Sequence, residues 1–247
     1  MKSSDTYALA AGIAVAGGAL ATSSASEAAV RPRTAGETKV VALFGTTGRS
    51  NGTAHELALR GMFESKKDWR LVFVRSDRLF TPDLIRDADL FIVGRDASPD
   101  PIDLFAKDAG IADSVTPGAP FWTDANVRAI IDNVENRGMG LMAMQGTVLC
   151  GHHGFMTFLD VAGIEPHEIE PMWYTRFNTT HPIVSGVGKF SVLHDEQPLV
   201  IVKSPGTATL FESTAVHEKR QGVSGWALER GRGRIVGLLP GSTTHAY

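Results

Sequence analysis

The chain has 247 residues, of which 43% are hydrophobic and 21% are charged, a composition that is typical of a globular protein and excludes global disorder. Its 24 Lys and Arg and 27 Asp and Glu give a formal charge of −3, which offers no basic surface for nucleic acid or for an anionic membrane. Cys150 is the single cysteine, so an intrachain disulfide is excluded.

The first 36 residues have the features of a leader segment. Lys2 precedes a small, apolar stretch at residues 7–21, and an Ala-rich stretch at residues 25–29 offers cleavage sites. Together these parts are typical of an export signal, so we expect a periplasmic or secreted protein. The alternative is a disordered leader on a cytoplasmic protein. After the leader, no apolar run reaches the roughly 20 residues that a membrane-spanning helix needs.

Strands and helices alternate in the first half of the mature chain. Continuous apolar runs predict buried strands at residues 39–45, 70–75, 89–94 and 140–144. Thr53 and Glu56 fit a capping box at the start of the helix that follows the first strand. We therefore expect an α/β fold with a doubly wound, mostly parallel sheet and helices on both faces.

A second helix is predicted to begin after Thr123, which is a suitable N-cap. Its apolar face is formed at helical spacing by Val127, Ile130, Ile131 and Val134, and Gly138 suits its C-terminus. The preceding residues 95–122 carry four prolines and no long element. This segment is either a lid at the end of the third strand or a surface insertion with a short helix at residues 102–108.

The second half of the chain differs in character. Short strands are predicted at residues 190–194, 199–203, 208–212, 225–229 and 234–239. Residues 230–233, with the sequence Arg-Gly-Arg-Gly, are expected to form the turn of a hairpin. We expect residues 37–247 to fold as one domain, with these short additional strands in its C-terminal half.

Ligands of doubly wound sheets bind at the carboxyl ends of the strands. Residues at the expected strand ends are therefore candidates for substrate binding: Thr46, Asp96, Gln145 and Gly146. His55 lies in the first turn of the first helix, where the helix N-terminus lowers a histidine pKa and supplies backbone donors. It is a candidate base or metal ligand, and the alternative is an exposed histidine without a function.

Further acid–base candidates lie in the second half. Asp195 and Glu196 follow a strand, and because neighbours on an extended chain face opposite sides, one of them is expected to reach the pocket. His181 precedes Pro182, which restricts it to an extended conformation and can aim its ring; a packed turn residue is the alternative. His245 lies close to the C-terminus. Histidine with Asp or Glu on converging loops suits Zn or Mn, but no spaced metal motif is present, so a divalent metal stays an open alternative.

Cys150 is followed closely by two histidines, His152 and His153. The three residues suggest either a nucleophile with its base or a pair of metal ligands. Adjacent histidines in a glycine-flanked loop point in different directions. The sequence therefore favours a partly buried, structural Cys150 with surface histidines.

Six short motifs follow one another after residue 177. They are Asn178-Thr-Thr-His-Pro-Ile-Val-Ser-Gly186, Lys189-Phe190, Asp195-Glu196, Val223-Ser-Gly-Trp226, Arg230-Gly-Arg-Gly-Arg-Ile-Val and Pro240-Gly-Ser-Thr-Thr-His245. In this order they resemble the trehalose-utilisation, or ThuA-like, family of the class I glutamine amidotransferase-like superfamily, and the resemblance extends over residues 39–247. It implies a flavodoxin-like core and a role in the metabolism of trehalose or a keto-sugar.

Two features depart from that family. At the turn after the fourth strand, where amidotransferases carry a nucleophilic cysteine and ThuA-like proteins usually a histidine, this chain has Gln145. Glutamine donates and accepts hydrogen bonds but is neither a nucleophile nor a base, so we do not expect glutamine amidotransferase activity. The family also continues with a helix after the final histidine, so we expect the chain to be truncated at Tyr247.

Taken with the candidate residues, the resemblance implies a protein that acts on a carbohydrate derivative by acid–base or metal-assisted chemistry, as a hydrolase, lyase or isomerase. The catalytic candidates are His55, His181, Asp195, Glu196 and His245. The substrate-binding candidates are Thr46, Asp96, Gln145, Gly146, Trp173 and Trp226. The two tryptophans are included because aromatic rings cover the apolar faces of sugars, and core packing is the alternative for Trp226. A non-catalytic sugar-binding or scaffold domain is the alternative function, and homo-oligomer formation stays open.

Overall fold

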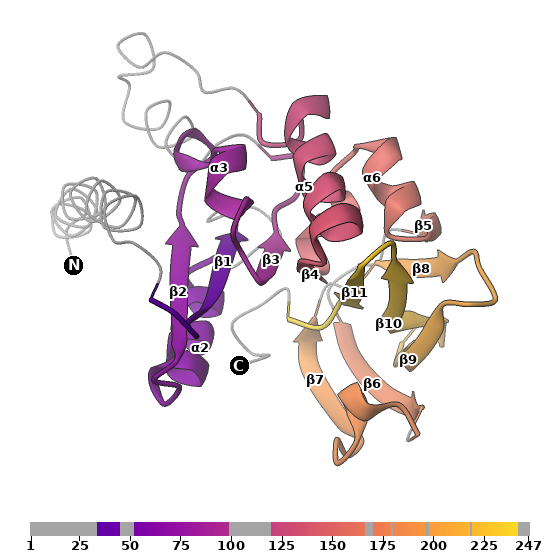
Figure 1. Cartoon of the computed structure of the whole chain (residues 1–247). Coiled ribbons are helices and arrows are strands. Elements are labelled where there is room, and N and C mark those ends of the chain that lie inside the picture. Colours follow the sequence, from indigo (N-terminus) through magenta and orange to yellow (C-terminus); the bar gives the residue numbers. More distant parts are fainter. Residues whose placement is uncertain are drawn as a thin grey trace, which may run out of the picture.

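The computed structural model describes residues 34–44, 52–98, 120–165, 170–178, 180–195, 198–217 and 219–241. A sheet of eleven strands runs through these residues (Figure 1). Residues 1–33, most of the expected leader, lie outside them. Within the described ranges, no helix is long and apolar enough to cross a membrane.

Parallel strands form one half of the sheet, in the order β2-β1-β3-β4-β11 (Figure 1). Their bounds are Trp69–Val74 for β2, Thr38–Phe44 for β1, Leu90–Gly94 for β3, Gly140–Met144 for β4 and Gly233–Leu238 for β11. The strands predicted in these places are confirmed, because their ends differ by no more than one residue. Residues such as Val40 and Val41 have no exposed surface, and burial on both faces explains the continuous apolar runs.

The remaining strands pair in antiparallel fashion. Next to β11 lie in turn β10 (Gln221–Arg230), β9 (Ala208–Ala215), β6 (Glu170–Phe177) and β7 (Phe190–Asp195), while β8 (Leu199–Val202) pairs with β10 and with β5 (Val161–Glu165). The sequence did not predict β5 and β6. β5 has only five residues, with a register shift at Gly163, and β6 contains Pro171, so neither has a clear strand pattern. The fold is thus a mixed α/β fold. One half of its sheet, with the order β2-β1-β3-β4-β11, is parallel, and the other half is antiparallel.

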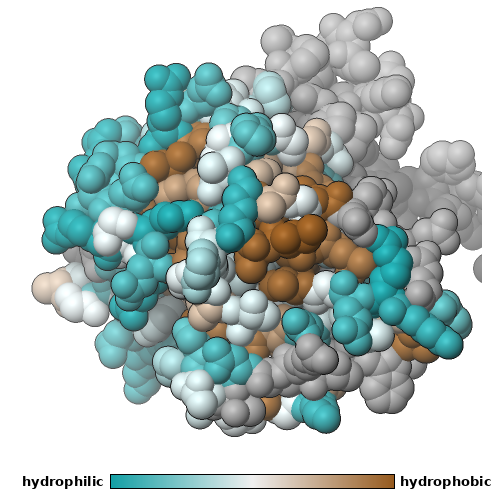
Figure 2. All heavy atoms as spheres, turned by 90° about the vertical axis from the view of Figure 1, so that its right-hand side faces the viewer, coloured by the Kyte–Doolittle hydropathy of each residue, from teal (hydrophilic) through white to brown (hydrophobic). Residues whose placement is uncertain are grey.

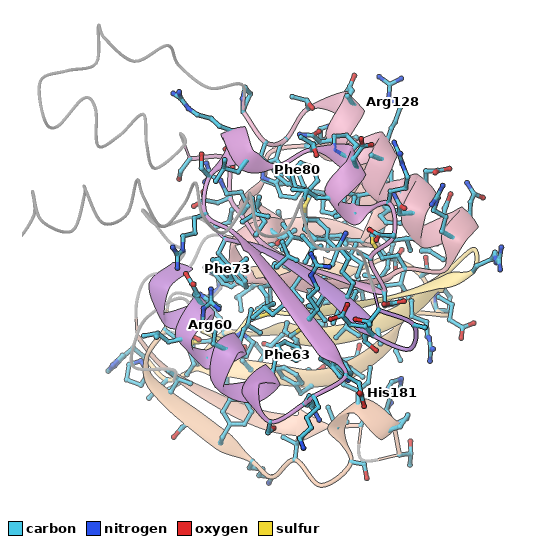
Figure 3. The ribbon with its side chains drawn as sticks, turned by 60° about the vertical axis from the view of Figure 1, so that its left-hand side comes forward. Arg60, Phe63, Phe73, Phe80, Arg128 and His181 are labelled. Atoms are coloured by element: carbon cyan, nitrogen blue, oxygen red, sulfur yellow. The ribbon has the colours of Figure 1, made fainter. Side chains whose placement is uncertain are left out.

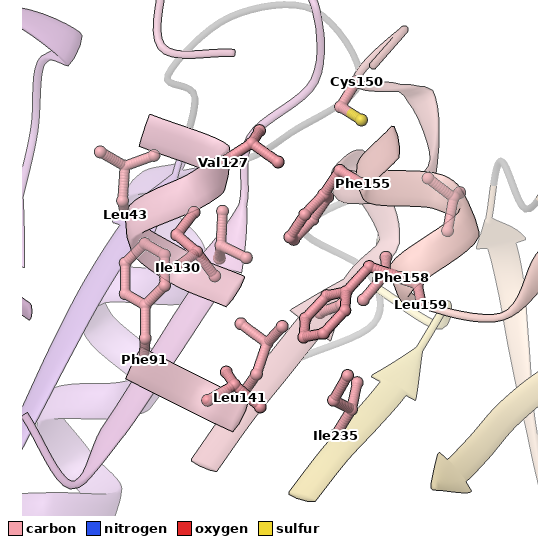
Figure 4. Packing of buried hydrophobic residues seen from close by; sticks show 14 of the residues in the cluster. Leu43, Phe91, Val127, Ile130, Leu141, Cys150, Phe155, Phe158, Leu159 and Ile235 are labelled. Atoms are coloured by element: carbon pink, nitrogen blue, oxygen red, sulfur yellow. The ribbon is translucent and has the colours of Figure 1, made fainter. Parts of the chain in front are cut away.

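Helices cover both faces of the parallel strands. On one face, α2 (Gly52–Glu64) packs Leu59 and Phe63 in a cluster with Val40, Ala42 and Phe44 of β1. The other face is covered by α3 (Pro82–Ile85), α5 (Asp124–Arg137) and α6 (His153–Phe158). Figure 4 shows the core on that side, where side chains of α5 and α6 meet those of the sheet. Short 3₁₀ helices are η1 (Asp77–Leu79), η3 (Gln145–Leu149) and η4 (Pro182–Val184). The short helix expected at residues 102–108 lies outside the described residues.

The sequence predicts both ends of α5. The Thr123 hydroxyl accepts a hydrogen bond from the Asn126 N–H at 3.2 Å. Gly138 ends the helix in the left-handed conformation, with a φ of +82°. Most of the predicted apolar face is buried, since Ile130 and Val134 have no exposed surface, whereas Ile131 is partly buried against the same core. Local signals were therefore sufficient to predict this helix.

The capping box expected at the start of α2 is wrong. The helix begins at Gly52, one residue before Thr53. The Glu56 carboxylate accepts hydrogen bonds from Arg75 and Arg60. Arg75 follows β2, so it reaches the helix only once β1 and β2 have paired, which local sequence cannot indicate.

The hairpin predicted at residues 230–233 joins β10 to β11 and lies against the end of α5. The Arg232 N–H donates to the Glu135 carbonyl oxygen at 2.7 Å. A Cβ atom at Gly233 would lie 2.5 Å from the Val134 carbonyl oxygen, so a side chain at this position does not fit. This close approach connects the antiparallel half of the sheet to the helices over the parallel half.

Candidate functional site

The carboxyl ends of β1, β3, β4 and β11 lie side by side, and we call this line of strand ends the carboxyl edge. The register aligns Phe44 with Gly94, and Met144 with Leu238. Neighbouring strands are roughly 4.8 Å apart, so the four ends span roughly 14 Å. The segments that follow these ends carry His55, Asp96, Gln145 and Gly241.

His55 is held against the end of β1. Its ring stacks on that of Phe44, with the ring centroids 4.4 Å apart and the ring planes inclined by 20°. The Phe44 ring in turn lies over β3, because a Cβ atom at Gly94 would be 2.3 Å from it and 3.3 Å from the Met144 Cβ. Only 4% of His55 is exposed, so the alternative of an exposed histidine is wrong. The imidazole therefore lies over strand ends next to the one that leads into Gln145.

Gln145 begins the turn after β4, where η3 starts. It is 2% exposed, and Gly146 and Thr147 beside it are buried. The Thr147 hydroxyl donates to the carbonyl oxygen of Val93, which fixes η3 to β3. A buried amide at this place can recognise a hydroxyl or carbonyl group by hydrogen bonds, but it cannot supply a nucleophile.

Asp195 reaches the same edge from the other half of the sheet. It is the last residue of β7, and its side chain has no exposed surface. Its Oδ2 accepts a hydrogen bond from the Gly241 N–H at 3.1 Å, beyond the end of β11. Three strands separate β7 from β11 in the sheet, so the antiparallel half folds back; in Figure 1 the chain after β11 passes the tip of β7.

Asp96 belongs to a buried ion network after β3. Arg95, only 1% exposed, forms two hydrogen bonds of 3.0 Å with the carboxylate of Asp77 and one of 3.0 Å with Asp96 Oδ1. The Ser98 N–H donates to the same Asp96 oxygen at 2.9 Å. Asp96 therefore holds the backbone after β3, and its expected contact with substrate stays a prediction. Asp77 and the role of Arg95 were not predicted from the sequence, although charged residues soon after two apolar strands were a usable signal.

A second charged group lies beside His55. The Glu56 carboxylate accepts hydrogen bonds from Arg75 at 2.6 and 2.9 Å and from Arg60 Nε at 2.8 Å. Burial opposes ionisation of Glu56, but these two guanidinium groups outweigh it and lower the pKa of the carboxyl below its usual value. The hydrogen bond with Glu56 raises the pKa of Arg75. Figure 3 shows Arg60 on the α2 side of the sheet with Phe63 and Phe73.

Cys150 is structural in this arrangement. It is 3% exposed, and burial raises the pKa of its thiol to about 11. His152 turns its ring nitrogens elsewhere: Nδ1 accepts from the Phe155 N–H at 3.2 Å, and Nε2 lies 3.1 Å from Asp124 Oδ1. A nucleophile needs a thiolate and an adjacent base, but burial disfavours the thiolate here and both ring nitrogens of His152 contact other groups. The predicted structural role of Cys150 is supported.

His181 and Trp226 are accounted for by structural contacts. His181 caps η4, where its Nδ1 accepts from the Ile183 N–H at 3.3 Å, and Figure 3 shows it well separated from Arg60. Trp226 has no exposed surface, and its indole N–H donates to the Leu159 carbonyl oxygen at 3.0 Å. Core packing, the alternative for Trp226, accounts for this side chain.

The other candidates stay predictions. Trp173 lies on β6, opposite Ser191 of β7 and Thr214 of β9. Thr46, Glu196 and His245 lie outside the described residues. Within the part of the chain that the structure describes, no three His, Cys, Asp or Glu side chains form a group that could hold a metal ion.

No protein-family model matches this sequence, and no curated protein matches it either. Among solved structures, the chain is similar to a protein from Bacteroides uniformis that is provisionally described as ThuA-like. The TM-score is 0.56 at 10% sequence identity, and the match covers 85% of this chain and 84% of that chain. At this identity the two proteins share a fold. The expected resemblance to ThuA-like proteins is therefore supported at the level of the fold.

Two weaker similarities belong to larger proteins. An exo-β-1,4-mannosidase from Opitutaceae bacterium strain TAV5 matches with a TM-score of 0.46 and 10% identity, over 82% of this chain and 31% of that chain. A glutamine amidotransferase from Methylobacillus flagellatus matches with a TM-score of 0.44 and 11% identity, over 79% of this chain and 66% of that chain.

Proposed function

We propose that residues 37–247 form a ThuA-like domain, with a flavodoxin-like core, that performs acid–base chemistry on a carbohydrate derivative at the carboxyl edge. The observation that carries the proposal is that three buried polar side chains lie beside segments that follow the strand ends of this edge. His55 stacks on Phe44, Gln145 opens η3, and Asp195 is bound to the Gly241 N–H. They come from distant parts of the chain, and polar groups are rarely buried without a structural or functional reason.

Each of the three side chains suits a role on an oxidised sugar. A histidine can take or give a proton next to a keto group, and its stack on Phe44 restricts the direction in which the imidazole points. Gln145 can donate to a carbonyl oxygen and accept from a hydroxyl group. Asp195, held by a backbone N–H, can accept from a second hydroxyl group or orient a proton-transferring residue. Elimination, hydration or isomerisation needs no more than such groups.

Covalent catalysis by an acyl-transfer mechanism finds no support. The turn after β4 carries Gln145, and the thiol of Cys150 is buried with a raised pKa. Metal-assisted chemistry stays a prediction that would draw on His245 or Glu196 in addition to the described residues. A non-catalytic sugar-binding domain is the second candidate, because an amide stands where related proteins carry a reactive side chain.

NMR of the purified full chain with disaccharides and their 3-keto derivatives, with and without divalent metal, tests the proposal. We expect a new product from the keto-sugars alone, and its loss in His55→Ala with the fold intact. His217→Ala, an exposed histidine beyond β9, is the matched control. Line broadening of a sugar without turnover would favour the binding domain. If the experiment shows no turnover and no binding of any sugar, both proposed functions are overturned.

A further inference from the structure

A pocket of about 260 Å³ lies between α6, β5 and the end of β8, and we call it the α6–β5 pocket. It is lined by Val148, Gly151, His153, Met156, Val161, Ala162, Gly163, Ile164 and Lys203. Among the described residues that line it, all except His153 and Lys203 are apolar or glycine, and none is acidic. Figure 2 looks onto this side of the molecule and shows apolar surface at its centre with hydrophilic side chains around it.

The two basic residues determine which charge the pocket accepts. Both side chains are exposed, and among the described residues neither the Lys203 ammonium nor the His153 ring has a hydrogen-bond or ion-pair partner. Asp160, whose carbonyl oxygen accepts from the Lys203 N–H, uses its carboxylate on the backbone and hydroxyl of Ser204 at 2.9 and 2.7 Å. The Lys203 ammonium is positive and the His153 ring can donate a hydrogen bond, so beside an apolar cavity they complement an anion that carries an apolar tail.

The walls of the pocket are held by contacts that do not depend on a ligand. The His152 ring accepts from the Phe155 N–H and so fixes the start of α6. Asp160 fixes the turn after Lys203 through Ser204 and Thr207. Val148 and Val161 belong to the buried core. A pocket that exists before binding spares the ligand the free energy of ordering the protein.

The volume limits the size of the ligand. A water-sized group occupies about 30 Å³, so the pocket holds roughly nine non-hydrogen atoms. Hexanoate has eight, and longer acids would extend into solvent. We propose that the α6–β5 pocket binds a C4–C6 aliphatic monocarboxylate, with its tail against Met156, Val161 and Ile164 and its carboxylate beside Lys203 and His153. This proposal does not rest on the chemistry proposed at the carboxyl edge, although Val148 belongs to η3, which begins there with Gln145.

Titration of the full chain, followed by NMR of the backbone amides, tests the proposal with acetate, butanoate, hexanoate, octanoate and neutral hexanamide. We expect affinity to rise about fourfold for each methylene up to hexanoate and to level off at octanoate. Hexanamide should bind about tenfold more weakly than hexanoate. The shifted amides should lie in α6, β5 and the turn after β8.

Substitutions separate the charge from the cavity. Lys203→Gln should weaken hexanoate about tenfold and leave hexanamide unchanged, whereas Lys189→Gln, an exposed lysine just before β7, should change neither. Ala162→Leu, which adds a side chain to the exposed lining of β5, should weaken both ligands. Equal effects of the two lysine substitutions, affinity that does not depend on chain length, or the absence of saturable binding would each overturn the proposal.

Discussion

The Oδ2 atom of Asp195 accepts a hydrogen bond from the backbone N–H of Gly241 at 3.1 Å, so the end of β7 is bound to the segment after β11. These two strands are not neighbours in the sheet, and the bond closes the antiparallel half onto the carboxyl edge. Because Asp195 has no exposed surface, the bond lies in an environment where an unpaired N–H is unfavourable.

Asp195→Ala should therefore destabilise the protein by about 1–3 kcal/mol, since it leaves the Gly241 N–H without its acceptor. Asp195→Asn keeps an oxygen in place and should lose less stability. Urea unfolding followed by circular dichroism measures both. If the carboxylate also takes part in the proposed chemistry, both variants lose turnover. Equal stability of the two variants would contradict the role of this hydrogen bond.

Gly94→Ala tests the stack that holds His55. The new Cβ atom would lie 2.3 Å from the Phe44 ring, which must move and take its contact with His55 along. We expect a loss of about 1–3 kcal/mol of stability and reduced turnover of a keto-sugar. Gly61→Ala on α2 is the control, because a Cβ atom there meets nothing within 4 Å. That variant should gain roughly 0.5–1 kcal/mol from helix propensity.

Arg95→Met removes the cation from a buried network and leaves Asp77 and Asp96 without it. Breaking a buried pair by removal of one partner costs about 3–5 kcal/mol, and here two carboxylates are affected. The exposed pair of Asp83 on α3 and Arg86 just after it gives the comparison, and Arg86→Met should lose less than about 1 kcal/mol of stability. Chemical denaturation measures the stability loss of each variant relative to wild type. Similar unfolding midpoints for Arg95→Met and Arg86→Met would rule out a stabilising network at Arg95.

Asp160 makes stability depend on pH. Burial opposes its ionisation, but hydrogen bonds from Thr207 and Ser204 outweigh this effect and lower the pKa of the carboxyl. The ionised group therefore favours the folded state, and its contribution is present above the ordinary Asp pKa of about 4 and is lost as the pH falls through the folded-state pKa. Asn tolerates the positive φ of 67° at this position, so Asp160→Asn is a suitable variant.

We expect the stability difference between wild type and Asp160→Asn to be largest near neutral pH and to shrink below about pH 4. Thermal unfolding between pH 7 and pH 3 measures it. Asp132→Asn, on the exposed side of α5, should show a small difference at every pH. If the stability difference between wild type and Asp160→Asn instead grows as the pH falls, the sign of the pKa shift is wrong.

Cys150 should resist alkylation in the folded protein. With a pKa of about 11, roughly one thiol in a thousand is ionised at pH 8, and the side chain is buried as well. Mass spectrometry after treatment with iodoacetamide should show unmodified protein until a denaturant is added. Rapid modification of the native chain would instead place Cys150 in an accessible, activated environment.

Local sequence determined the parts of this fold that depend on neighbours along the chain. The apolar runs predicted the parallel strands because both faces of each strand are buried. Thr123 and Gly138 marked the ends of α5 because capping needs only residues within a turn of the helix. The order of these elements was enough to place His55 and Gln145 at strand ends on a common edge.

Only the tertiary structure decided which side chains meet there. The approach of Asp195 to Gly241, the pairing of Arg95 with Asp77 and the stack of His55 on Phe44 join segments that no local pattern connects. β5 and β6 escaped prediction because a short strand with Gly163 and a strand with Pro171 are stabilised by their partners rather than by their own sequence. The burial of Trp226 and Cys150 also depends on tertiary partners, because helices and strands pack around these side chains only once the sheet has formed.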